Sequence, residues 1–153
     1  MEKIGAYKIL PDKQLIIEYY SGELTIKDLM FFKTIIRKEP NYNFDWKTIA
    51  DFRDCNLLIK NAELEKLVEF LKNNFEKSYS RKVAILSAKP IEVALSILYS
   101  LLVKETGLDY DTFVFSTTQG VVQTFDEKLI SEKELIEIIS DLKTKPNNIY
   151  NSA

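Results

Sequence analysis

Apolar residues follow two periodicities along the chain, and the two alternate from one end to the other. Between short apolar runs, apolar residues recur every three to four positions, which indicates helices that bury one face. The runs predict strands at residues 4–10, 14–20, 46–52, 83–86 and 112–116, and the spaced positions predict helices at 26–38, 62–77, 90–105, 118–125 and from 131 to the Pro146-Asn147-Asn148 stop. Strands that alternate with helices predict a mostly parallel sheet with right-handed crossovers.

Local signals refine this order. Residues 11–13 have the composition of a hairpin turn, so the first strand is expected to be an antiparallel edge strand. Ser21-Gly22-Glu23 is expected to break the second strand, and Asn61 to cap the second helix. Thr25 with Asp28, and Ser131 with Glu134, have the spacing of capping boxes at helix starts.

The length, 153 residues, is that of one domain. We therefore expect a single α/β domain over residues 1–145, with a five-stranded, mostly parallel sheet. Residues 146–153 are expected to form a frayed C-terminal tail.

Composition excludes several kinds of chemistry. Histidine is absent and there is one cysteine, Cys55, which removes histidine-based catalysis, histidine metal ligands and an intramolecular disulfide. Four glycines form no phosphate-binding loop, and a net charge of -2 disfavours nucleic-acid binding. We therefore expect no catalytic residue, no metal and no cofactor. The apolar run at residues 91–103 is too short to span a membrane and no secretory signal is visible, so a cytoplasmic location is expected.

Polar residues gather where the predicted strands end, and the carboxyl ends of parallel strands share one edge of a sheet. Helix N-termini at this edge could also bind an anion. The candidate ligand-binding residues are Asp51, Arg53, Asp54, Lys60, Asn61, Ser87, Lys89, Ser116 and Thr118.

The group Asp51, Arg53 and Asp54 has two interpretations. Paired carboxylates can divide acid and base roles in catalysis, which would make this an enzyme site with strongly shifted pKa values. Alternatively, Asp51 anchors the loop and Arg53 pairs with a carboxylate, in which case the group is structural. The structural interpretation is favoured, because no second catalytic signature accompanies these residues.

The predicted helix is apolar nearly all round from residue 91 to residue 103, apart from a stripe of Glu92, Ser96 and Ser100. Such a helix must be covered by something. The cover is either the C-terminal part of the chain, a second copy, or a hydrophobic ligand or membrane surface. For self-association, the candidate interface residues are Leu95, Leu98, Tyr99 and Leu102.

Two segments resemble a known family. The segment at residues 15–25, followed by a helix that ends at Lys38-Glu39-Pro40, and the segment at residues 46–54 with its Asp-x-Arg-Asp turn resemble the STAS, or SpoIIAA-like, domains and their CRAL-TRIO-type relatives. The likeness covers residues 4–125. It implies a right-handed β-α superhelix and a non-enzymatic module that binds proteins, nucleotides or small apolar molecules.

One feature departs from the anti-sigma-factor antagonists of that family. They carry a phosphorylated serine after the third strand, whereas residues 59–62 here contain neither serine nor threonine. The resemblance therefore favours the uncharacterised bacterial branch over a kinase-controlled switch. The function expected is an interaction or regulatory module, self-associating as a homodimer or bound to a protein partner. The alternative is a carrier of a hydrophobic small molecule or lipid.

Overall fold

A computed structural model describes residues 2–126 and 128–151. Its sheet has the strand order β1-β2-β3-β4-β5, in which β1 is antiparallel to β2 and every other pair is parallel. The strands are β1 (Ile4–Leu10), β2 (Leu15–Thr25), β3 (Lys47–Leu58), β4 (Arg81–Leu86) and β5 (Tyr110–Phe115). The helices are α1 (Ile26–Ile36), α2 (Leu64–Asn74), α3 (Pro90–Glu105), α4 (Thr118–Phe125) and α5 (Glu132–Thr144).

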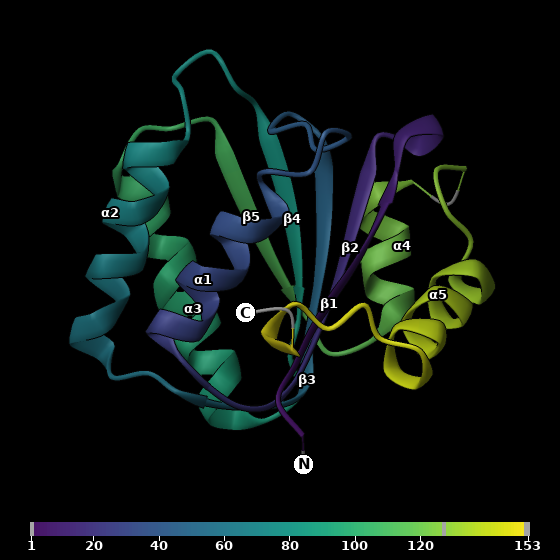
Figure 1. The fold of residues 1–153 in the computed structure, drawn as a ribbon. Coiled ribbons are helices and arrows are strands. Elements are labelled where there is room, and N and C mark those ends of the chain that lie inside the picture. The colour runs from purple at the N-terminus through teal and green to yellow at the C-terminus, as the bar shows by residue number, and fades with distance from the viewer. Residues whose placement is uncertain (1, 127, 152–153) are drawn as a thin grey trace.

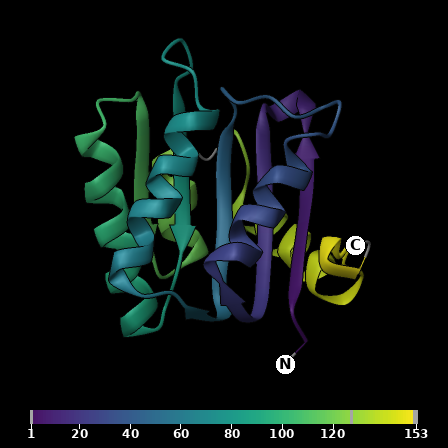
Figure 2. The same ribbon diagram turned by 60° about the vertical axis from the view of Figure 1, so that its left-hand side comes forward.

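Two helical layers enclose the sheet (Figure 1). Helices α1, α2 and α3 cover one face, and α4 and α5 cover the other. Figure 2 shows α3 at the outer edge of its layer, beside β5. Side chains of β2 alternate between the layers, since Ile16 packs with the α1 side while Leu15 and Ile17 pack with the α5 side. The predicted α/β class, five-stranded sheet and antiparallel edge strand are therefore confirmed.

Predictions that depend on residues close together in the sequence are confirmed at two helix starts. Thr25 and Asp28 form the expected capping box, and Ser131 Oγ accepts a hydrogen bond from the Glu134 amide at 3.1 Å. The bounds of α3 and α4 match the prediction. Asn61, the expected cap of α2, instead begins a short 3₁₀ turn, Asn61–Glu63, that precedes the helix.

Strands β2 and β3 are longer than their apolar runs predicted. The expected break at Ser21-Gly22-Glu23 is wrong, because β2 continues to Thr25 while β3 continues to Leu58. Each supplies the other's backbone hydrogen-bond partners, with Gly22 opposite Cys55. Gly22 has φ +82°, and a Cβ there would lie 2.8 Å from the Glu2 carbonyl oxygen, so this position needs glycine.

The expectation of a frayed tail is also wrong for the residues described. The chain crosses from α5 past the open edge of β1 to α1 (Figure 1). The Asn147 side chain accepts a hydrogen bond from the Tyr7 amide and donates one to the Tyr7 carbonyl. Tyr150 Oη then donates to the Asp28 carbonyl at 3.0 Å. This segment therefore covers the edge of β1, although the domain boundary at residue 145 stays a prediction.

The tail contacts generate a stability prediction. Asn148 accepts hydrogen bonds from the amides of Gly5 and Tyr150 and donates one to the Lys3 carbonyl. Asn148→Ala is expected to lower the free energy of unfolding by about 1–3 kcal/mol, because it leaves edge-strand groups unpaired. Urea denaturation measures the change, with the exposed Asn151→Ala as control. Equal stability of the two variants would contradict a structural role for the tail.

Candidate functional site

The predicted group Asp51, Arg53 and Asp54 lies inside β3, not in a turn after it. Between two paired positions, the residues from Tyr19 to Ser21 on β2 face the longer stretch from Asp51 to Asp54 on β3. This extra residue on β3 is a β-bulge. It carries Asp54 onto the α5 face beside Asp51, and it returns Cys55 to the opposite core.

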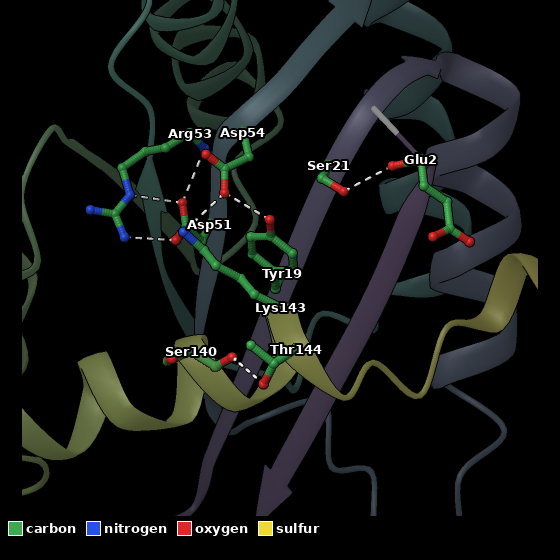
Figure 3. Close-up of polar contacts among 9 residues, drawn as sticks. All are labelled: Glu2, Tyr19, Ser21, Asp51, Arg53, Asp54, Ser140, Lys143 and Thr144. Atoms are coloured by element: carbon green, nitrogen blue, oxygen red, sulfur yellow. Dashed lines mark hydrogen bonds and ion pairs between the residues drawn. The ribbon is translucent and has the colours of Figure 1, made fainter.

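The network around the bulge is internally paired (Figure 3). Both carboxylate oxygens of Asp51 accept from the Arg53 guanidinium, at 2.9 Å from Nε and 2.7 Å from Nη2. Asp51 Oδ1 also accepts from the Arg53 backbone amide at 3.0 Å. Asp54 Oδ2 accepts from Tyr19 Oη at 2.7 Å and lies 3.0 Å from Lys143 Nζ of α5. The bulge is thereby tied to the neighbouring strand and to α5.

The pKa shifts agree with this pairing. Burial alone would raise the pKa of Asp54, but hydrogen bonds from Tyr19 and Lys143 outweigh it, and the pKa is lowered overall. Burial, followed by the Asp54 hydrogen bond and charge, raises the pKa of Tyr19. The hydrogen bond to Asp51 raises the pKa of Arg53. Asp54 and Arg53 are thus held in their charged forms, as partners in an ion-pair network would be.

The remaining candidate ligand-binding residues do not join the network of Asp51, Arg53 and Asp54. Lys89 Nζ donates to the Cys55 carbonyl and to Asn56 Oδ1, which anchors the end of β3 on the α3 side. Thr118 Oγ1 donates to Glu132, and Ser87 is buried with its hydroxyl unpaired among the described residues. Exposed at separate places are Lys60, Asn61 and Ser116.

The reason for this dispersal is the unequal length of the strands. The last residue of β4, Leu86, is level with Asp51, whereas β3 continues to Leu58. The carboxyl ends of the two strands therefore lie at different heights. None of the nine candidate ligand-binding residues lines the cavity between the α1–α3 layer and the sheet, and their role in binding stays a prediction.

Helix α3 presents a different face from the one expected. Leu95 is buried in the core cluster under α1, and three further candidate interface residues, Leu98, Tyr99 and Leu102, are half-buried against core clusters. The interface prediction is corrected for Leu95, because the sheet and α2 already cover that side of the helix. The exposed apolar side chains of α3 are Ile91, Ile97 and Leu101.

The sequence analysis missed a cavity of about 90 Å³ between the α1–α3 layer and the sheet. Its walls are mostly apolar and include Leu29, Leu64, Leu71 and Leu95 of the helices and Val83 and Ile85 of β4. The side chains of Lys33, Arg37 and Arg81 also line it. A signal was present in the sequence, since Arg37 follows the apolar end of α1 and Arg81 stands two residues before the apolar run at residues 83–86.

Metal-binding clusters and membrane-spanning helices are both absent from the described residues. Among them, no group of three or more acidic, cysteine or histidine side chains could hold a metal ion. Within the same residues, no helix has the length and apolar character needed to cross a bilayer. The cellular location stays a prediction.

The ion-pair network generates a pH prediction. Since the pKa of Asp54 is lowered, its contribution to stability is present above the ordinary aspartate pKa of about 3.9 and is lost as the pH falls through the folded-state pKa. At pH 7, Asp54→Asn is expected to lower the free energy of unfolding by about 1 kcal/mol, a modest value because the side chain is partly exposed.

The difference between Asp54→Asn and the parent protein should shrink below pH 4, where the wild-type carboxylate protonates. Urea unfolding at a series of pH values measures it, with the exposed Asp12→Asn as control. A difference that stays constant from pH 7 to the acid limit would contradict the assigned charge.

Comparisons with known proteins show a likeness in fold to a solved structure. No family model matches the chain, and no curated protein matches it. A crystal structure of an uncharacterized protein from the DUF3478 family, from Shewanella loihica PV-4 and with a SpoIIAA-like fold, is similar to it. The TM-score is 0.54 at 9% identity, covering 82% of this chain and 97% of the other. The fold is therefore SpoIIAA-like, as the resemblance implied.

Proposed function

We propose that this protein is a non-enzymatic interaction module that associates with a second copy of itself through the outer surface formed by α3 and β5. The observation that carries the proposal is the exposed apolar row on α3. Ile97 and Leu101 are about half exposed and lie four positions apart, on one side of the helix. Ile91, at the first turn, is more exposed and lies roughly 100° round the helix from them. Exposed apolar side chains grouped on one helix are typical of interaction surfaces.

The two edges of the sheet support the same surface. The edge of β1 is covered by the C-terminal segment through Asn147 and Asn148. The other edge strand, β5, pairs only with β4 in the described part of the chain. An edge strand offers unpaired backbone groups to another chain, and here it lies beside α3, the helix that carries the exposed apolar residues (Figure 2). A second copy packed on this side would cover both.

The pairing of Asp51 and Asp54 with neighbouring side chains supports a non-enzymatic module. Asp51 is held on both oxygens by Arg53, and Asp54 by Tyr19 and Lys143. Carboxylates engaged in this way serve the packing of α5 on the sheet. We propose, on the same basis, that the group is structural, and we keep the cytoplasmic location as part of this proposal.

The interface generates a prediction on oligomeric state. The parent protein is expected to sediment as a dimer, and Ile97→Lys is expected to raise the dimer dissociation constant at least about tenfold, because a lysine would be desolvated in the interface. Sedimentation velocity over a concentration series measures this change.

Ile136→Lys supplies a matched control on the opposite layer, since Ile136 is 49% exposed and Ile97 is 48% exposed. A parent protein that stays monomeric at high concentration would contradict the proposal. Equal dissociation of both variants would place the interface elsewhere.

A second candidate function is the binding of a small molecule, and the cavity favours it. Its volume, about 90 Å³, is several times the roughly 10–15 Å³ that a cavity needs to hold one water molecule. Drug-sized ligands occupy pockets of about 300–1,000 Å³, so the cavity fits a compact molecule and not a lipid. We therefore propose, in place of the lipid carrier, a protein that binds small ligands.

A further inference from the structure

The cavity under α1–α3 has an excess of positive charge. Lys33, Arg37 and Arg81 line it. Glu18 is the carboxylate that balances Lys33, since the Lys33 ammonium lies 2.6 Å from Glu18 Oε2. Neither arginine has an ion-pair partner within residues 2–126 and 128–151.

The guanidinium of Arg81 donates its hydrogen bonds to uncharged oxygen atoms. Nε donates to Thr48 Oγ1 at 3.1 Å, Nη1 donates to Tyr42 Oη at 2.6 Å, and Nη2 also donates to Thr48. The side chain is buried at the start of β4. Each guanidinium nitrogen therefore has a neutral acceptor, and the acid whose charge acts on Arg81 is Glu18, which already pairs with Lys33.

Arg37 differs from Arg81, because its donors are not satisfied. The guanidinium lies between two aromatic rings, 5.4 Å from the ring centre of Phe44 and 5.1 Å from that of Phe70. Its Nε and Nη1 are shielded from solvent and have no acceptor among the described residues. Shielded donors without an acceptor are unfavourable unless an anion or another acceptor reaches them, even though Arg37 as a whole is only partly buried.

We propose that this cavity binds a small organic carboxylate, with Arg37 as the group that binds its anionic end and the leucine and valine walls contacting its apolar end. The proposal rests on the second candidate function and names its ligand class. A carboxylate supplies the negative charge and the acceptor oxygens that Arg37 lacks. The apolar walls select an organic acid over inorganic phosphate, and the volume limits it to a few carbons.

The test compares butyrate with butyramide, which has the same carbon skeleton and no charge, and with inorganic phosphate. Titration calorimetry on the full chain measures each affinity. Butyrate is expected to bind at least about tenfold more tightly than butyramide, because a charge-assisted hydrogen bond replaces a neutral one. Phosphate is expected to bind more weakly than butyrate.

The matched variants are Arg37→Met and Lys38→Met, which remove the same charge from adjacent residues, of which Lys38 is exposed and does not line the cavity. Arg37→Met should abolish the preference for butyrate, Lys38→Met should retain it, and Arg37→Lys should restore part of it. Without ligand, Arg37→Met should be at least as stable as the parent, because it removes unmet donors from the protein interior.

The possible results distinguish failure of the carboxylate assignment from failure of small-molecule binding as such. Equal affinities for butyrate and butyramide would overturn the carboxylate assignment and leave small-molecule binding intact. Absence of binding by both would overturn the assignment together with that function. Unchanged butyrate binding by Arg37→Met, or a marked loss of its ligand-free stability, would assign Arg37 a structural role and overturn the proposal.

Discussion

Strands β2 and β3 are buried on both faces, and this constraint organises the rest of the molecule. Alternate residues of β2 enter two different cores, with Ile16 and Tyr20 on one side and Leu15 and Ile17 on the other. The three helices that connect the parallel strands all lie on one face, so they cover only one of the two cores (Figure 1). The chain beyond β5 supplies the second layer, α4 and α5, which closes the remaining face.

Holding that second layer requires contacts between segments far apart in sequence. The bulge in β3 places Asp54 where Lys143 of α5 reaches it, and the C-terminal segment then covers the edge of β1. Both devices use polar groups, and each is satisfied by its own partners. The acidic group thus contributes to how the two layers are assembled, whereas the cations around the cavity are incompletely matched. Incomplete matching is the physical distinction between the structural and the ligand-binding interpretations.

The two proposed functions use opposite sides of α3. The cavity is lined by inward-facing residues of α3 such as Leu95 and Tyr99, while the proposed interface uses Ile97 and Leu101 on the outward side of the same helix. The near-complete apolar circumference of α3 therefore serves two surfaces. One side packs in the monomer and borders the cavity, and the other remains available to a second chain.

The order of elements and the capped starts of α1 and α5 were determined by the sequence, because periodicity and capping depend on residues a few positions apart. The true lengths of β2 and β3, the bulge at Asp51–Asp54, the docking of Asn148 and the inward face of α3 were decided only by tertiary structure. Each depends on a partner distant in the chain: β2 for β3, Gly5 for Asn148, and the sheet for α3. The cavity belongs to this second group, since Arg37 at the end of α1 and Arg81 of β4 line one space only when the helical layer packs on the sheet.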